Sequence, residues 1–111
     1  MKYNRLGTSD IEVSEFTLGC WPFAGGNVWG DQDDADSIAA VHASLDAGIN
    51  FFDTADTYGT GYGGEILAKA FKKQRHEIII GTKFHHPLLE QHRLLVEPSI
   101  EFIVLFGELL F

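Results

Sequence analysis

The stretch that decides the fold is NFFDTADTYGTG, residues 50–61. It begins as a short apolar segment, which is typical of a parallel strand buried on both faces. Ile49, Phe51 and Phe52 fit such a strand, and Asp53 follows them directly. Polar residues and glycines come next, as expected of a loop. The pattern therefore predicts that Asp53 lies at the carboxyl tip of a buried strand.

A second segment repeats this pattern later in the chain. Residues 78–82 read Ile-Ile-Ile-Gly-Thr, and Lys83 follows them. In parallel β/α folds the reacting groups gather at the carboxyl ends of the strands. We therefore expect Asp53 and Lys83 to lie on one face of the sheet, with Tyr58 on the loop between them in sequence.

Several separate motifs carry a family resemblance. They are YNRLGTSDIEVS (3–14), LGCW (18–21), GINFFDTADTYG (48–59) and TK (82–83). In order and spacing they resemble the aldo-keto reductase family over residues 1–83. The resemblance implies an α/β fold, the N-terminal portion of a (β/α)8 TIM barrel with an N-terminal β-hairpin. It also implies an oxidoreductase that reduces aldehydes or ketones by hydride transfer from NADP(H).

The resemblance also implies a set of catalytic residues. Three members of the family's Asp, Tyr, Lys and His tetrad are then Asp53, Tyr58 and Lys83. A carbonyl that accepts hydride needs a proton, and a phenol with a pKa of about 10 gives it reluctantly at neutral pH. An adjacent cation lowers such a pKa. Lys83 takes this role by resemblance, Asp53 holds Lys83, and Tyr58 is the proton donor. The alternative is that Asp53 and Lys83 form only a structural ion pair.

Aromatic residues and glycines are frequent in the loop over residues 21–30. Large rigid aromatic side chains supply apolar area, so Trp21 and Trp29 are candidates for the wall of a substrate pocket. The alternative is that they only cover the mouth of the barrel. By resemblance, Cys20 and Trp21 line the nicotinamide end of NADP(H), and Asp53 contacts its ribose. No metal site is expected, because the acidic run 31–36 is explained by the start of a helix.

The remaining pattern predicts the order of the elements. We expect a hairpin over residues 3–13, strands near 16–20, 49–53 and 78–82, and helices near 34–47 and 65–73. Residues 1–83 then form an N-terminal half barrel. The family usually has a Ser-Glu pair where Gly63 and Gly64 stand. The second helix therefore loses a side-chain cap, and the loop that carries Tyr58 is expected to be more mobile.

Beyond Lys83 the resemblance fades, and residues 84–111 change in character. His85, His86 and His92 come too early to follow a further strand, so the fourth member of the tetrad is not identified. We expect a divergent tail with a truncated or frame-shifted end, and negligible activity of the isolated chain. Two function classes remain: the N-terminal piece of a reductase, or a non-catalytic remnant or interaction subunit that self-associates through open sheet edges.

Composition excludes some partners. The 111 residues include 16 acidic and 8 basic side chains, a net charge of −8, which opposes electrostatic binding to nucleic acid or to an anionic membrane. A small-molecule carbonyl compound is the expected partner. One cysteine allows no internal disulfide, and the N-terminus lacks a signal-peptide pattern, so a cytoplasmic location is expected. A (β/α)8 barrel takes about 250 residues, so this length covers less than half of one.

Overall fold

Four short strands form one parallel sheet in the computed structural model, which describes residues 1–72, 74–83 and 103–104. In spatial order they are β3 (Leu18–Gly19), β4 (Phe51–Asp53), β5 (Ile79–Thr82) and β6 (Ile103–Val104). Each neighbouring pair is parallel, and Asp53 lies opposite Gly81. We predicted that the strand ending at Asp53 pairs in parallel with the strand that precedes Lys83. The parallel pairing of β4 with β5 confirms this.

The last of these strands was not predicted from the sequence. β6 pairs with β5 through the registers Gly81 to Ile103 and Thr82 to Val104. It lies within residues 84–111, and the rest of that segment falls outside the described residues. The predictions of a truncated end and those about His85, His86 and His92 fall on that undescribed part. Among the described strands, β3 has a single strand neighbour. Self-association through open sheet edges stays a prediction.

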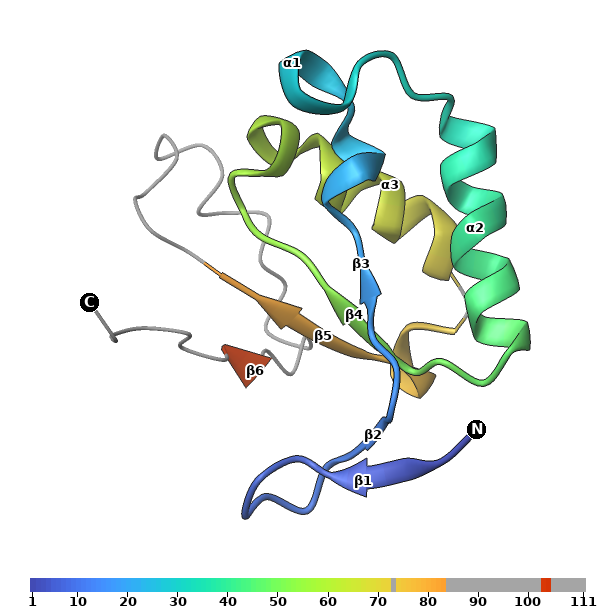
Figure 1. The fold of residues 1–111 in the computed structure, drawn as a ribbon, viewed down its shortest axis with the longest axis vertical. Helices are drawn as coiled ribbons and strands as arrows, with labels where there is room; N and C mark the ends of the chain where they lie inside the picture. Colours follow the sequence, from blue (N-terminus) through green and yellow to red (C-terminus); the bar gives the residue numbers. More distant parts are fainter. Residues whose placement is uncertain (73, 84–102, 105–111) are drawn as a thin grey trace.

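The predicted N-terminal hairpin is confirmed, and it lies beyond the end of the sheet at which the strands begin (Figure 1). Its strands are β1 (Tyr3–Arg5) and β2 (Glu12–Ser14). The Asn50 side chain joins it to the start of β4: its Oδ1 accepts from the Ser14 N–H at 2.7 Å and its Nδ2 donates to the Glu12 carbonyl at 3.0 Å. This hairpin has a structural role.

Two helices, α2 (Asp34–Asp46) and α3 (Tyr62–Phe71), cover one face of the sheet and pack against each other (Figure 1). The side chain of Asp33 caps α2 by accepting from the backbone N–H groups of Ala35, at 2.7 Å, and Asp36, at 3.3 Å. An N-cap carboxylate satisfies donors that the helix itself leaves unpaired. The acidic run therefore begins the helix, as predicted.

The core lies between these helices and the sheet. Phe52 of β4 meets Phe71 of α3 edge to face, with ring centroids 4.8 Å apart. Alternate residues of a strand face opposite sides, so Asp53 points away from this core. The rest of the buried cluster is Cys20, Val41, Leu67, Ala70 and Ile78. None of the helices in the described part of the chain is long and apolar enough to cross a membrane.

Helix α3 begins earlier than the sequence predicted. Its first residue is Tyr62, not Glu65, and Gly63 and Gly64 therefore lie in its first turn. Its N-cap is Gly61, which has no side chain to cap the helix, so the start is uncapped, but at Gly61 and not at Gly63 or Gly64 as predicted. Glycine disfavours a helix interior, so the early start must come from tertiary contacts.

Short helical turns occupy the loops that the sequence left irregular. At the carboxyl ends of the strands lie η1 (Trp21–Ala24), α1 (Gly26–Trp29) and η2 (Tyr58–Gly61), whereas η3 (Arg75–Glu77) precedes β5. The turns η1 and η2 contact each other and the start of α3. The loops that carry the predicted site residues therefore form one packed group.

Candidate active site

Lys83 joins the tips of β4 and β5. Its Nζ lies 2.7 and 2.8 Å from the two carboxylate oxygens of Asp53, 3.2 Å from the Thr54 carbonyl and 3.4 Å from the phenol oxygen of Tyr58. An ammonium has three protons to donate, so these acceptors use all of them. The structure thus brings together Asp53, Tyr58 and Lys83, and the predicted convergence is confirmed.

The charge of Lys83 is maintained by its partners. Burial lowers the pKa of Lys83, but the hydrogen bonds and charges of Asp53 and Tyr58 together outweigh burial and raise the pKa above its ordinary value. Lys83 is therefore a cation at neutral pH. The ion pair is half-exposed, and such pairs typically contribute about 0–1 kcal/mol to stability. Its main consequence is a fixed positive charge beside a phenol.

The backbone holds these strand tips in register with the loop of Tyr58. The Cys20 N–H donates to the Asp53 carbonyl at 2.8 Å, and the Thr54 N–H donates to the Gly81 carbonyl at 2.8 Å. The Asp56 N–H donates to the Lys83 carbonyl at 3.1 Å, which ties the loop to the end of β5. The positions of the site residues therefore follow from sheet hydrogen bonds that continue into the loop.

The Tyr58 phenol accepts a hydrogen bond from Lys83 and, among the described residues, donates none. The ring is stacked on the indole of Trp21, with centroids 5.6 Å apart and planes at 15°. The Lys83 ammonium lies 5.5 Å from the centroid of the same ring. The sequence placed Trp21 near the site but did not predict this stack.

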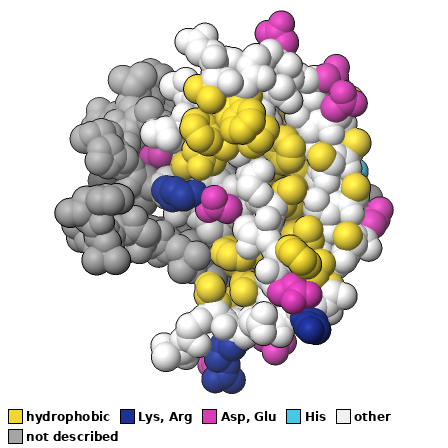
Figure 2. All heavy atoms as spheres, viewed as in Figure 1, with side chains coloured by type: hydrophobic (Ala, Val, Ile, Leu, Met, Phe, Trp, Pro, Cys, Tyr) yellow, Lys and Arg dark blue, Asp and Glu magenta, His cyan; other side chains and the backbone are white. Residues whose placement is uncertain are grey.

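The two tryptophans form one aromatic group beside the phenol. Trp29 meets Trp21 edge to face at 5.6 Å, and the two residues are 43% and 45% exposed. In the space-filling view, hydrophobic side chains gather over the loops that follow β3 and β4 (Figure 2). A half-exposed indole next to Tyr58 can contact a ligand, so this placement supports the predicted substrate wall. That role stays a prediction.

Cys20 behaves differently from its prediction. Its side chain has no exposed surface and belongs to the core cluster. Direct contact of the thiol with a cofactor therefore has no support in this geometry. Cys20 instead contributes through its backbone, because its N–H binds the carbonyl of Asp53. Burial, with a smaller contribution from the charge of Asp53 and an opposing one from Lys83, raises the pKa of the thiol to about 12.

This burial predicts an inert thiol. We expect Cys20 in the folded chain to resist a thiol reagent, and to react once urea unfolds it, because the thiolate is the reactive form. The thiol keeps its proton in the folded state up to a pKa of about 12 but loses it near 9.0 when unfolded. The contribution of the buried, protonated thiol to the free energy of unfolding is therefore present below pH 9.0. It is lost as the pH rises from 9.0 toward about 12. Labelling rates and alkaline unfolding of Cys20→Ala check this; rapid labelling of the folded chain would contradict it.

The turn that follows Tyr58 is strained. Gly59 and Thr60 both have left-handed backbone angles, with φ of 58° and 57°. A β-branched residue rarely adopts this conformation. A Cβ atom at Gly59 would stand 2.8 Å from the Cβ of Ala24, which is closer than such atoms approach. Glycine at position 59 thus permits the contact between η1 and η2.

Substitutions at Gly59 and Thr60 are expected to change the free energy of unfolding in opposite directions. We expect Thr60→Asn to raise the free energy of unfolding by about 1 kcal/mol, because asparagine tolerates the left-handed region. We expect Gly59→Ala to lower it by about 1 kcal/mol or more, because both the backbone angle and the contact with Ala24 are unfavourable. Urea unfolding followed by circular dichroism measures both. Equal effects at the two positions would contradict the observed turn.

A surface cavity of about 220 Å³ lies at the opposite end of the sheet, where β4 and β5 begin. Active sites of parallel β/α barrels lie at the carboxyl ends, so this cavity is not the candidate site. Its lining residues are Tyr3, Leu45, Asp46, Gly48, Ile49, Asn50, Gln74 and Glu77.

Comparisons with known proteins agree with this geometry. The model of the Aldo/keto reductase family matches residues 15–100. Aldo-keto reductase YhdN of Bacillus subtilis (strain 168) is 41% identical over 85 residues, covering 75% of this chain and 25% of the relative. NADH-specific methylglyoxal reductase of Escherichia coli (strain K12) is 39% identical over 85 residues, covering 75% and 26%. The holo form of aldo-keto reductase AKR11C1 from Bacillus halodurans has a TM-score of 0.65 at 36% identity, covering 74% and 25%.

The chain spans about a quarter of the length of these curated relatives. The structural match confirms the predicted fold class, because the solved neighbours are aldo-keto reductases and the described residues superpose on part of them. The family match extends past Lys83, to residue 100. With most of its length matched by the family model, and with a parallel sheet that brings a carboxylate, a phenol and an ammonium together, the chain belongs to the aldo/keto reductase family.

Proposed function

We propose that this chain supplies the proton-donating part of an NADP(H)-dependent oxidoreductase that reduces aldehydes or ketones to alcohols. One observation carries the proposal: the Lys83 ammonium lies 2.7 Å from the Asp53 carboxylate and 3.4 Å from the Tyr58 phenol. A purely structural ion pair needs only the carboxylate and the ammonium. The phenol that the same ammonium contacts favours the catalytic interpretation over a non-catalytic subunit.

Each residue has a distinct part in the proposed reaction. Tyr58 donates its phenolic proton to the carbonyl oxygen while the carbonyl carbon accepts a hydride, which gives the alcohol. The positive charge of Lys83 stabilises the phenolate that remains, until solvent returns the proton. Asp53 holds the ammonium through two hydrogen bonds and so fixes the direction of that charge. Such preorganised charges avoid reorganisation during the reaction.

The described residues fit the nicotinamide end of the cofactor. The Asp53 carboxylate is an acceptor for a ribose hydroxyl, and Trp21 presents a half-exposed planar surface beside Tyr58. When bound, the reduced nicotinamide supplies the hydride. The Escherichia coli relative is named as NADH-specific, so NADPH and NADH are both to be tested. Carbonyl substrates of low molecular mass and a cytoplasmic location complete the proposal; the single cysteine, which allows no internal disulfide, supports the location.

A chimera tests this function. Residues 1–83 of this chain, which include the N-terminal hairpin, replace the corresponding segment of the Bacillus subtilis relative, which supplies the rest of a barrel. We expect the chimera to oxidise NADPH or NADH in the presence of methylglyoxal or an aromatic aldehyde, measured by nicotinamide absorbance. The 111-residue chain, assayed in parallel, is expected to oxidise little cofactor. In the family, most of the groups whose binding energy positions the cofactor lie on later strands of the barrel. A folded chimera without turnover would refute the proposal.

A further inference from the structure

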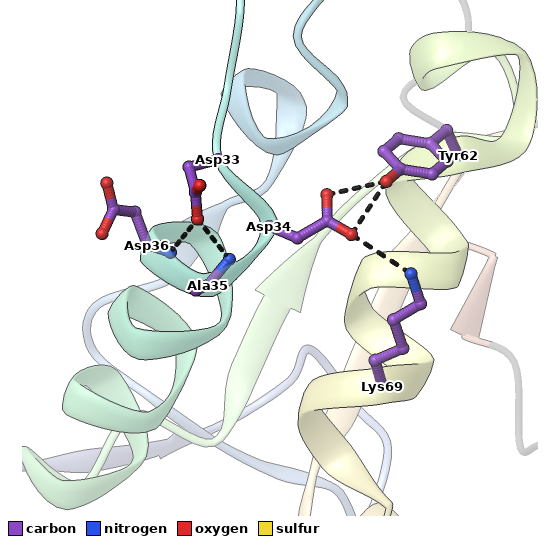
Figure 3. Close-up of polar contacts among 6 residues, drawn as sticks. All are labelled: Asp33, Asp34, Ala35, Asp36, Tyr62 and Lys69. Atoms are coloured by element: carbon purple, nitrogen blue, oxygen red, sulfur yellow. Dashed lines mark hydrogen bonds and ion pairs between the residues drawn. The ribbon is translucent and has the colours of Figure 1, made fainter.

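Three exposed side chains connect α2 and α3 beside the candidate site (Figure 3). The Tyr62 hydroxyl donates to the carboxylate of Asp34, whose oxygens lie 2.7 and 2.8 Å away. The Lys69 ammonium lies 3.2 Å from the same carboxylate and 5.6 Å from the centroid of the Tyr62 ring. Asp34 belongs to the first turn of α2, and Tyr62 is the first residue of α3. The cluster therefore links the beginnings of the two helices.

The first turn of α3 has little intrinsic stability. Gly61, Gly63 and Gly64 surround Tyr62, and the N-cap makes no side-chain hydrogen bond. Glycine loses more backbone freedom in a helix than any other residue. Tyr62 is the single residue among positions 61–64 with a side chain beyond a hydrogen atom. Its hydrogen bond to Asp34 is the side-chain hydrogen bond that positions 61–64 make within the described part of the chain, and it adds to the contacts of α3 with η1 and η2.

Tyr58 rests on that same turn. A Cβ atom added at Gly63 would stand 3.4 Å from both the Cβ and the carbonyl oxygen of Tyr58, an ordinary van der Waals distance, so the first turn of α3 lies next to the backbone of Tyr58. The connecting residues 59–61 all have left-handed angles, with φ of 58°, 57° and 100°. Only three residues separate Tyr58 from Tyr62, so a shift of the first turn of α3 is expected to displace Tyr58.

We propose that the hydrogen bond between Asp34 and Tyr62, supported by Lys69, positions Tyr58 against Trp21 and Lys83. Asp34 and Tyr62 are positioning residues, because neither touches the reacting groups. The hydrogen bond from Tyr62 lowers the pKa of Asp34, and it raises the pKa of Tyr62. At neutral pH the acceptor is thus ionised and the donor protonated, which is the state that the bond needs. The expected effect of this bond on turnover rests on the proposed function, whereas its expected effect on the position of the Tyr58 ring does not.

Nuclear magnetic resonance of ring-labelled tyrosine tests the geometric claim in the 111-residue chain. The chain has three tyrosines, and Trp21 shifts the Tyr58 ring signal through its ring current. Trp21→Leu defines the signal of an unstacked Tyr58. We expect Tyr62→Phe, which removes one hydroxyl, to move the Tyr58 signal toward that reference. Tyr3→Phe is the matched control, because the Tyr3 hydroxyl makes one 2.8 Å hydrogen bond, to the Gly48 carbonyl, at the opposite end of the fold.

A second pair of variants tests the same bond from α2. Asp34→Ala is expected to move the Tyr58 signal as Tyr62→Phe does, whereas Asp36→Ala, which removes another first-turn carboxylate of α2, is expected to leave it in place. The double variant should move the Tyr58 signal no further than Asp34→Ala does, because Asp34→Ala already removes the bond to Tyr62 together with that to Lys69. Circular dichroism reports whether each variant folds. A folded Tyr62→Phe or Asp34→Ala chain with an unmoved Tyr58 signal overturns the proposal.

The chimera separates this proposal from the function itself. There, Tyr62→Phe is expected to lower kcat with little change in KM, since Tyr62 does not contact substrate. An inactive chimera in which Tyr62→Phe still moves the Tyr58 signal refutes the function but supports the positioning role. An active chimera whose kcat is unaffected by Tyr62→Phe, with an unmoved signal, refutes the positioning role alone.

Discussion

Turnover of the chimera is expected to fall by about 10²- to 10⁴-fold when Tyr58 is replaced by phenylalanine, the range typical of a lost general acid. The substitution removes the hydroxyl of the proposed proton donor but retains the ring that stacks on Trp21. Binding of the reduced cofactor should change little, because the ring and Asp53 remain. Steady-state kinetics with NADPH and NADH, together with nicotinamide fluorescence titration, measure both quantities.

Tyr3→Phe controls for the general effect of removing a tyrosine hydroxyl, and it is expected to leave turnover unchanged. Lys83→Met removes the charge that contacts the phenol. If Lys83 acts through Tyr58, the double variant should be little worse than Tyr58→Phe alone, because residues that act as a unit are not additive. Turnover that survives Tyr58→Phe would show that another group donates the proton.

The largest effect on stability is expected at Phe52. Its side chain is fully buried, and it meets Phe71 with ring centroids 4.8 Å apart. We expect Phe52→Ala to lower the free energy of unfolding by about 3–5 kcal/mol, the range measured for phenylalanine truncation in protein cores. Small domains typically have about 5–15 kcal/mol in total, so this variant approaches the limit of folding.

Phe16→Ala is the matched control, because it makes the same chemical change at a residue that is 62% exposed. Its expected effect is within about 0.5 kcal/mol of zero, as for most surface substitutions. Urea unfolding followed by circular dichroism measures both variants. A similar loss at the two positions would mean that the sheet and helices do not pack as described.

The ion pair at the candidate site contributes little to the stability of the fold. Asp53 and Lys83 are about half-exposed, and exposed ion pairs typically contribute about 0–1 kcal/mol. The fold depends instead on the apolar cluster on the other face of β4, to which Phe52 belongs. Changes at the strand tips are therefore expected to alter the chemistry of the site without unfolding the chain.

Local patterns in the sequence determined the strands and the convergence of the site. Buried apolar runs predict parallel strands, and the polar residues that follow them must then lie at one end of the sheet. This places Asp53, Tyr58 and Lys83 together without any knowledge of distances. The acidic run likewise predicts the start of α2, because a cap depends on residues within one turn. The motif resemblance identified the family.

Tertiary structure alone decided the features that depend on contacts between distant segments. Glycines at positions 63 and 64 predict a late start for the second helix, yet α3 begins at Tyr62, whose hydroxyl bonds to Asp34 on another helix. A lone cysteine beside an aromatic loop gives no sign of whether its thiol faces a ligand or the core, and packing buries Cys20 completely. The stack of Trp21 on Tyr58 also joins two loops far apart in sequence. Local propensity does not determine such contacts, because their energies come from surfaces that meet only after the chain has folded.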